Sequence, residues 1–410
     1  MNFKTVLLAA AVVGVAGTAQ AADLAKKAPA AANYVKVCDA YGAGFFYIPG
    51  SDTCLKIGGY VRADLYAFDT SREWASYGNS GAAGRTKHAI NTLAKAQLQF
   101  DARTATEMGL LRSYVEVNIA NYSANRGTTA TGMTLELSKG FVQFGGLTAG
   151  RAQSFFDFWT GDTFGAWFEP AHSDTTVNLF GYTFAFGNGI TASVSLEDPS
   201  TGSWNGRRIG SYYAGVKSPD VVANVNIAQA WGSAQIMAAL HDGYSATSVG
   251  GLDTDKWGYA VGAGVKINLP MLGASDTLTL QGAYSKGAVS YAGPDFGQDG
   301  TSALYIADMT MTGAGALEQN TAWSVSGALT HGWTKTLTSS LEASYAGFDV
   351  AKTAVGDFKQ LDVQANLVWA PVAGLSVGPE IEYRHIDFST ATGSPDVHAL
   401  VGMFRVQRNF

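Results

Sequence analysis

"NLFGYTFAFGNGITASVSLED" (residues 178–198) is the stretch of the sequence that decides the fold. Its residues alternate between apolar and polar with a period of two, which is the period of a β-strand. The alternation breaks at Asn188-Gly189, a dipeptide typical of the two-residue turn of a β-hairpin. One face carries Phe180, Tyr182, Phe184 and Phe186, continued by Ile190, Ala192, Val194 and Leu196; the other carries Thr191, Ser193, Ser195 and Glu197. The stretch predicts two antiparallel strands, each with one apolar and one polar face.

The same alternation recurs along the chain, in LKIGGYVRADLYAF (55–68), LDVQANLVW (361–369) and HALVGMFRVQRNF (398–410). In a soluble sandwich the apolar faces of such strands pack against each other and the polar faces meet water. In an outer-membrane barrel the apolar face meets lipid and the polar face lines a wet lumen. In the last stretch Leu400, Phe404, Val406 and Phe410 would then face lipid and Arg405 the lumen. The periodicity alone does not separate the two architectures.

The composition favours the membrane barrel. Charged residues make up 15% of the chain, against about 25% in soluble domains. Glycine accounts for 49 of 410 residues, aromatic residues make up 12%, and the mean hydropathy is +0.04. Alternating strands explain a chain that is poor in charge and yet lacks a long apolar run. Without residues 1–21 the chain has 26 Lys and Arg against 33 Asp and Glu, a net charge of −7 that gives no sign of a nucleic-acid partner.

The first residues predict export. Lys4, the apolar run VLLAAAVVGVAG and the small-residue site AQA form a signal peptide at residues 1–21, cut after Ala21. The run is shorter than the roughly 20 apolar residues of a membrane-spanning helix. Residues 22–54 then form a short periplasmic leader that contains Cys38 and Cys54. In an oxidising compartment this pair predicts a disulfide-closed loop, whereas a metal or redox pair would require nearby histidine or a CxxC spacing.

Connection lengths give the number of strands. Short turns, such as those at 145–147, 187–189, 231–233, 270–276, 334–336 and 370–375, alternate with long segments rich in Gly, Ser, Thr and Asp. This pattern is typical of a barrel with short turns at one end and large outer loops at the other. The alternation holds if residues 198–220 are one outer loop, with five strands before residue 152 and eleven after residue 177. The sequence therefore predicts an all-β fold, a 16-stranded antiparallel transmembrane β-barrel over residues 55–410.

The segment 152–177, AQSFFDFWTGDTFGAWFEPAHSDTTV, is too aromatic for an ordinary exposed loop. It is the third outer loop, and it also carries the carboxylates Asp157, Asp162, Glu169 and Asp174. One interpretation is a lid packed over the barrel mouth. The interpretation we favour is an inward-folded loop, anchored in the lumen by its aromatic residues, with its carboxylates facing the pore.

Cations occupy the polar phase of the strands nearest the two chain ends: Arg62, Lys95, Arg112, Arg384 and Arg405. The first and last strands of a closed barrel are neighbours, so these side chains would form one basic wall, with Arg151 added at the end of the fifth strand. Any one of them alone is a solvated charge. Gathered opposite an acidic loop, they predict a charged constriction that favours polar solutes and biases ion selectivity.

Four stretches resemble the alphaproteobacterial, rhizobial-type porins: VKVCDAYGAGFFYIPGSDTCLKIGGYVRADL (35–65), FGGLTAGRAQSFFDF (144–158), PDVVANVNIAQAWGSAQ (219–235) and the ending FRVQRNF. The resemblance covers the whole mature chain. It implies a 16-stranded outer-membrane barrel, a homotrimer, passive diffusion of small hydrophilic solutes and ions, and a pore narrowed by the third outer loop. It also implies that Phe410 is part of the signal read by the outer-membrane assembly machinery, although Arg408 stands where many such barrels have an aromatic residue.

Other functions find less support in the sequence. The six histidines occur without HExxH or GxSxG, so no catalytic motif indicates an enzyme, and we expect no cofactor and no metal. PDFGQDG (294–300) has the composition of a loop that could hold calcium, and we take it as loop chemistry. A substrate-specific channel with a sugar or anion site in the lumen is the main alternative, followed by a secreted soluble β-protein.

Overall fold

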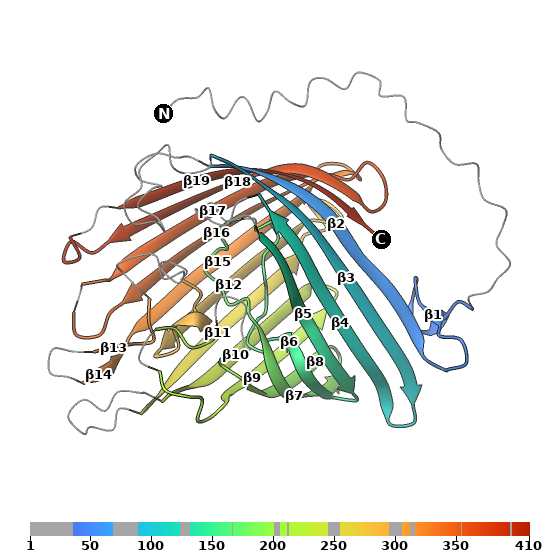
Figure 1. Cartoon of the computed structure of the whole chain (residues 1–410), viewed down its shortest axis with the longest axis horizontal. Coiled ribbons are helices and arrows are strands. Elements are labelled where there is room, and N and C mark those ends of the chain that lie inside the picture. The colour runs from blue at the N-terminus through green and yellow to red at the C-terminus, as the bar shows by residue number, and fades with distance from the viewer. Residues whose placement is uncertain are drawn as a thin grey trace, which may run out of the picture.

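The computed structural model describes residues 36–68, 89–123, 132–165, 167–200, 206–210, 213–244, 255–294, 306–311, 316–353, 355–393 and 396–410. The predicted signal peptide, residues 22–35 of the leader and most of the PDFGQDG segment lie outside the described residues. Figure 1 shows a single barrel whose strands tilt strongly against the barrel axis.

Sixteen strands in the described residues form the barrel wall, which confirms the predicted fold class and strand number. They are β2 (Cys54–Phe68), β3 (Ile90–Thr106), β4 (Gly109–Tyr122), β5 (Gly132–Phe144), β6 (Leu147–Gln153), β7 (Thr176–Gly187), β8 (Ile190–Glu197), β9 (Asp220–Gln229), β10 (Gly232–Gly243), β11 (Lys256–Asn268), β12 (Thr277–Lys286), β15 (Thr321–Gly332), β16 (Leu337–Asp349), β17 (Phe358–Trp369), β18 (Leu375–Phe388) and β19 (Val397–Asn409). Five of them precede the aromatic segment and eleven follow it, as the connection lengths predict.

Each wall strand pairs antiparallel with its neighbours in the chain, and the last strand closes on the first. In the pairing of β19 with β2, Arg405 lies opposite Asp64 and Arg408 opposite Val61. Closure leaves neither terminal strand with an open edge, which is the condition for a sheet to stand in lipid.

The two phases of the strands are segregated as the alternation predicts. On β19 Val397, Val401 and Arg405 are buried, whereas Val406 on the other phase is exposed. On β7 the large apolar side chains that are exposed, Phe180, Tyr182, Phe184 and Phe186, all lie on one phase. The apolar phase therefore covers the outside of the barrel, and the polar phase lines its interior.

The hairpin of β7 and β8 turns at Asn188 and Gly189, with φ angles of 51° and 76°. Two consecutive positive φ angles define the turn that matches the twist of paired strands, and they explain the Asn-Gly dipeptide. A side chain at Gly189 would also lie 1.9 Å from the carbonyl oxygen of Ala228 on the neighbouring strand. The local sequence thus fixes this turn and the register of both strands.

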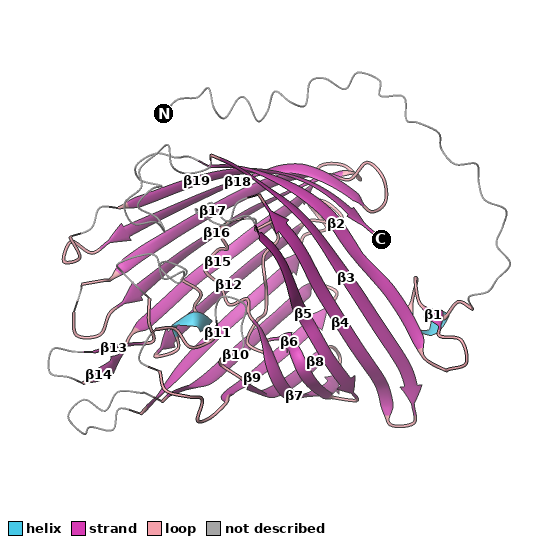
Figure 2. Cartoon of the chain, in the orientation of Figure 1, coloured by secondary structure: helices cyan, strands magenta, loops and turns pink. Residues whose placement is uncertain are grey.

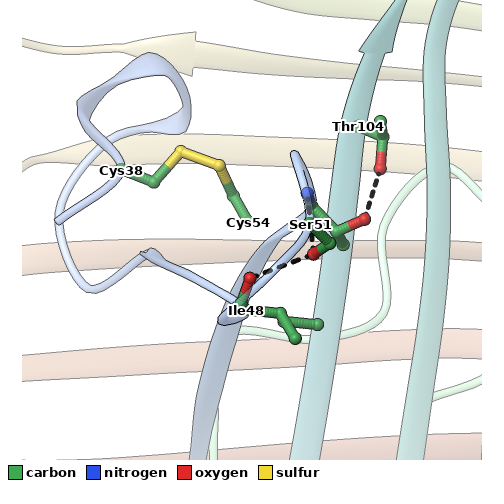
Figure 3. The surroundings of a disulfide bond; sticks show 6 residues. Cys38, Ile48, Ser51, Cys54 and Thr104 are labelled. Carbon is green, nitrogen blue, oxygen red and sulfur yellow. Dashed lines mark hydrogen bonds between the residues drawn. A yellow bond between two sulfur atoms is a disulfide. The ribbon is translucent and has the colours of Figure 1, made fainter. Parts of the chain in front are cut away.

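The cysteines form a disulfide, as predicted. Figure 3 shows Cys38 and Cys54 joined beside the start of β2, with Ser51 in the turn between them. Within this loop β1 (Phe46–Tyr47) pairs with the first residues of β2, and the hydroxyls of Thr53 and Thr104 are 2.9 Å apart. The loop is thereby attached to the end of the barrel where β3 turns into β4 (Figure 1).

The remaining elements are short: η2 (Asp39–Tyr41), η4 (Val289–Tyr291) and the hairpin β13 (Met309–Met311) with β14 (Leu317–Gln319). Figure 2 shows that strands dominate the molecule and that the helical turns are small. No helix within the described ranges is long and apolar enough to cross a membrane.

Candidate pore constriction

After β6 the chain leaves the wall, and residues 154–165 and 167–175 cross to the opposite side of the barrel. There the backbone N–H groups of Trp167 and Phe168 donate to the carboxylate of Glu382 on β18, at 3.1 and 2.9 Å to Oε2. The contacts span more than 200 positions of the sequence and reach the interior phase of β18. They confirm that the third outer loop is folded inward; we call residues 154–175 the constriction loop.

Two further glutamates on the far wall hold the constriction loop in the same way. Glu342 on β16 accepts the N–H of Asp162 at 3.0 Å and that of Thr163 at 3.1 Å. Glu380 on β18 accepts the N–H of Phe164. Backbone N–H groups in a loop need acceptors when they are withdrawn from water, and hydrogen bonds to a carboxylate are stronger than those to a neutral group.

Carboxylates also hold the first and the last residues of the constriction loop. Glu197 at the end of β8 accepts the Ser154 hydroxyl at 2.7 Å and the Phe155 N–H at 2.9 Å. Asp157 accepts the N–H of Thr175 at 2.7 Å and pairs with Arg207 at 3.2 Å. The loop is therefore anchored where it leaves the wall, where it returns, and across the lumen.

Five of the predicted cations lie on five adjacent strands, β18, β19, β2, β3 and β4, and all are on the interior phase. The structure adds a carboxylate beside most of them. Arg405 and Arg62 share Asp64, at 2.8 and 3.3 Å. Arg384 pairs with Asp362, and Arg112 pairs with Asp101 at 2.9 Å. Arg103, which the sequence analysis did not single out, pairs with the same Asp101 at 2.7 Å.

Lys95 differs from the other four cations. It lies opposite Arg62 in the pairing of β2 with β3, and it forms no ion pair with any residue that the structure describes. Its side chain is half-buried. Among these five cations, Lys95 is thus the one without an ion pair in the described part of the chain.

Aromatic side chains of the constriction loop cover two of the paired cations. The guanidinium of Arg405 lies 4.6 Å from the ring centre of Phe164, and that of Arg384 lies 4.6 Å from the ring centre of Phe168. Both arginines are almost fully buried. The predicted contact between loop and basic wall is therefore made by ring faces and by the Glu169 carbonyl, which accepts a hydrogen bond from Arg384 at 2.8 Å.

The loop carboxylates are arranged differently from the prediction of an acidic loop facing a basic wall. Asp157 pairs with Arg207, and Asp162 pairs at 3.2 Å with Lys266 on β11, away from the five wall cations. Asp174 accepts a hydrogen bond from Gln153 at 2.7 Å. Glu169 is exposed. The path of the loop brings Asp157 next to Arg207 and Asp162 next to Lys266, so neither carboxylate binds a cation of the wall.

Arg151 does not belong to the basic wall. It shares the exterior phase of β6 with Leu147 and lies opposite Gly140 on β5. Its Nε donates to the carbonyl oxygen of Leu137 at 3.0 Å, and the side chain approaches Glu136 at 3.7 Å. Pairing of β5 with β6 covers only residues 140–144, so Arg151 binds the backbone of β5 where no strand continues beside it.

Burial lowers the pKa of His172, which lies near the end of the constriction loop. Its ring packs 5.0 Å from the ring of Trp159, and the side chain is withdrawn from solvent. A buried imidazole favours the uncharged form because water no longer solvates its charge. The loop is therefore seated with an uncharged histidine in its interior.

A cavity of about 360 Å³ remains open between the base of the constriction loop and strands β4 to β7. Its polar lining comes from Arg112, Lys139, Gln143, Gln153, Thr148 and Thr183. Polar groups on a barrel interior beside a fixed loop are the arrangement expected of an aqueous passage.

Sequence comparison agrees with this geometry. Residues 23–401 match the Porin subfamily. The chain belongs to this porin family. The porin Omp2b of Brucella abortus (strain 2308) is 31% identical over 428 aligned residues, which cover the whole of both chains, and Omp2b of Brucella suis biovar 1 is 32% identical over 431. The resemblance to alphaproteobacterial porins is thereby confirmed, and this porin is an outer-membrane channel for passive diffusion.

Solved structures share the barrel. The outer membrane channel DcaP of Acinetobacter baumannii superposes with a TM-score of 0.69 at 17% identity, over 89% of this porin and 99% of that chain. OmpF of Salmonella typhi does so with a TM-score of 0.53 at 11% identity, over 88% and 99%. Because the sequence identities are this low, these two comparisons show that the fold is shared and nothing more.

The sequence analysis missed the residues that hold the constriction loop: Glu342, Glu380, Glu382 and Glu197. All four lie on the interior phase of their strands and are buried. Their signal was available in the alternation, since a glutamate on the lumen phase of a strand needs a donor once it is covered. Nothing in the alternation says that the donors are the N–H groups of the loop.

Proposed function

We propose that ions and small hydrophilic solutes cross this porin between the constriction loop and strands β2 to β4, which carry Arg62, Lys95 and Arg112, while Arg384 and Arg405 complete the basic wall beneath the loop. The observation that carries the proposal is the set of backbone hydrogen bonds from the constriction loop to Glu342, Glu380 and Glu382. They hold the loop across the lumen, so any solute has to pass beside it. Asp157, Asp162, Glu169 and Asp174 act mainly by shaping the loop.

The paired charges give the passage polarity with little net charge. Arg103 and Arg112, which both pair with Asp101, stay partly exposed and place positive and negative groups side by side on the wall, whereas the Arg405–Asp64 and Arg384–Asp362 pairs are buried beneath the loop. Such a surface orients water and hydrogen-bonds hydrophilic solutes, while apolar solutes lose hydration without compensation. Selectivity between cations and anions is then set by the charges that have no partner of opposite sign nearby, above all the charge of Lys95. Transport needs no chemical step, and we propose no enzymatic activity and no cofactor.

We also propose that the porin is a homotrimer. The support is the open edge of β5: beyond Gly140 it has no pairing with β6, and Met133, Leu135 and Leu137 beside it are 75%, 72% and 50% exposed. Unpaired backbone groups are costly in lipid. A neighbouring subunit that packs over this edge, and over Arg151 bound to it, removes that cost.

Delivery to the outer membrane completes the proposal. The signal peptide is cut after Ala21, residues 22–54 form the periplasmic leader, and Phe410 belongs to the signal read by the assembly machinery. Phe410 pairs through its N–H and carbonyl with Gly59 of the first strand, at 3.0 and 3.2 Å, and its side chain is 57% exposed. An exposed aromatic at the seam is accessible before the barrel closes.

Conductance of the purified porin in a planar bilayer tests the function. We expect discrete steps, an SDS-resistant oligomer that dissociates on boiling, and ohmic currents that added sugars reduce only in proportion to viscosity. An absence of steps would contradict the channel, and block by one sugar at micromolar concentration would favour a substrate-specific channel instead.

A further inference from the structure

Residues 288–293 and 306–308, in the outer connection between β12 and β15, lie in the barrel mouth. The turn η4 of this connection carries Val289, Ser290 and Tyr291, all buried (η4 is a cyan helix in Figure 2). The Tyr291 hydroxyl donates to Asp220 Oδ2 at 2.7 Å, and its ring packs 4.8 Å from that of Phe156 in the constriction loop. Since Asp220 shares the interior phase of β9 with Val222, η4 lies inside the barrel and on top of the constriction loop.

Gly293 lies in the same segment, which contacts the last residues of the constriction loop. Its φ is +74°, and an added side chain would lie 2.3 Å from the carbonyl oxygen of His172. The two backbones are therefore in direct contact. We call residues 288–293 and 306–308 the plug.

Asp308 anchors the plug. Its carboxylate is fully buried and accepts three hydrogen bonds, from the N–H of Val289 at 2.6 Å, the N–H of Ile209 at 2.7 Å and the hydroxyl of Tyr213 at 2.7 Å. These donors come from both outer connections, the one after β8 and the one after β12. One side chain thus ties two loops together inside the mouth.

His241 on β10 attaches this cluster to the wall. Its Nδ1 lies 2.8 Å from Asp220, and its Nε2 lies 2.7 Å from the Tyr213 hydroxyl. The ring lies between two buried carboxylates, since its Nε2 is also 3.9 Å from Asp308. A protonated ring at this point compensates negative charge that would otherwise be costly to bury.

Two arginines complete the charge balance. Arg207 stacks 4.0 Å from the Tyr291 ring centre and pairs with Asp157 of the constriction loop, and Arg208 stacks 4.1 Å from that of Tyr213. The plug is therefore linked to the constriction loop through Arg207 as well as through ring packing.

The plug also brings apolar side chains into the mouth. Val289, Tyr291, Ala292 and Ile306 belong to a buried hydrophobic cluster with interior residues of the wall, among them Val222, Met237, Ala260, Phe348 and Phe388. A dry cluster of this kind excludes hydrophilic solutes. The cavity beside β4 to β7 lies away from this cluster.

From these contacts we propose that the plug is a second constriction element, which Asp308 positions so that it closes the β9–β12 side of the lumen and confines solutes to the side lined by Arg112, Lys139, Gln143 and Gln153. The inference rests on the proposed channel function and adds the route through it. Asp308 is a positioning residue, since it contacts the plug and not the solute.

The test compares Asp308→Ala, Asp308→Asn and wild type in planar bilayers, with polyethylene glycols of increasing size added to find the exclusion limit. We expect a rise in single-channel conductance of roughly two-fold for Asp308→Ala, a larger exclusion limit and a smaller effect for Asp308→Asn, because a wider wet cross-section carries more ions. Asp276→Ala is the matched control: Asp276 also binds a histidine, at 2.6 Å, and a backbone N–H, but in the short turn before β12.

A thiol at Ser290 gives a second measurement that does not depend on conductance. Both native cysteines are in the disulfide, so Ser290→Cys introduces the one free thiol of the chain. A charged thiol reagent should modify it slowly in the otherwise native porin and at least about tenfold faster with Asp308→Ala, since modification requires opening.

The decisive case is an Asp308→Ala variant that still forms oligomers that dissociate on heating. If its conductance and exclusion limit are unchanged, or if its labelling rate is unchanged, the proposed role of the plug is wrong. Absence of conductance in wild type would instead overturn the channel function itself. If Asp308→Ala does not assemble, the labelling rate of Ser290→Cys in the Asp308→Asn variant tests the proposal instead.

Discussion

The guanidinium of Arg405 and the carboxylate of Asp64 form two parallel hydrogen bonds across the seam of the barrel, Nε to Oδ1 at 2.8 Å and a terminal nitrogen to Oδ2 at 2.9 Å. The two residues are 341 positions apart in the chain and directly opposite each other in the pairing of β19 with β2. Their exposed fractions are 4% and 3%. The last strand is therefore joined to the first by a buried, bidentate ion pair under Phe164.

Asp64→Ala should destabilise the closed barrel by roughly 3–5 kcal/mol, because it leaves the Arg405 charge buried without a partner. The denaturant midpoint of the detergent-folded porin measures the loss. A double variant, Asp64→Leu with Arg405→Met, removes both charges and should lie closer to wild type. A double variant as unstable as Asp64→Ala would show that packing, and not the unpaired charge, dominates.

Removing the disulfide by Cys38→Ser with Cys54→Ser should lower the free energy of unfolding by roughly 3 kcal/mol, the chain-entropy value for a loop of this size. Conductance should stay at the wild-type value, since the loop lies at the short-turn end and away from the constriction. Reduction of the wild-type porin should reproduce the same loss. A changed conductance would place the loop in the permeation path.

Glu382→Gln should loosen the constriction loop, because a neutral amide accepts weaker hydrogen bonds than a carboxylate from the N–H groups of Trp167 and Phe168, and it brings a donor of its own. We expect larger and noisier conductance steps. Glu107→Gln in the turn between β3 and β4 is the matched control, and it should leave the steps unchanged. Identical currents in both variants would mean that Glu342 and Glu380 suffice to hold the loop.

The alternation of apolar and polar residues predicted the architecture because the side-chain period of a strand is two and each phase has a single destination, lipid or lumen. It also placed Arg62, Lys95, Arg112, Arg384 and Arg405 on the interior. Their carboxylate partners depend on register between strands that are distant in sequence, as for Arg405 and Asp64, and alternation carries no information about that register.

Arg151 and the plug show a second limit. Arg151 interrupts the apolar phase of β6 because it binds the open edge of β5, a feature created by the early departure of the constriction loop. The plug residues Val289, Tyr291 and Ala292 are as apolar as lipid-facing residues, and only the tertiary structure places them inside the barrel. Both belong to segments whose path is set by tertiary contacts rather than by local period.

Lys95→Glu should shift the reversal potential in a salt gradient toward cation preference, since it replaces a cation without an ion pair by an anion at the same point of the wall. Arg405→Glu is a poor test of ion selectivity, because the new carboxylate would lie directly opposite Asp64 and the two charges would repel each other. Lys335→Glu, exposed in the turn between β15 and β16, makes the same change in net charge as a control. Equal shifts in the two variants would indicate a general surface effect and contradict a filter at Lys95.

His172 predicts that seating of the constriction loop depends on pH. Burial holds its pKa below the ordinary value of 6.5, so the released loop binds a proton that the seated loop does not. The equilibrium therefore shifts toward release as pH falls below about 6.5, by at most a factor of about ten per pH unit for one proton. A thiol introduced by Ala171→Cys, at a fully buried position, reports release through its modification rate. The control is the same thiol in a His172→Phe background, which keeps a ring against Trp159 and cannot be protonated. As the pH is lowered from 6.5 to 5, the modification rate should rise more with His172 than with Phe at this position. Equal changes in the two backgrounds would assign the acid sensitivity to carboxylates instead.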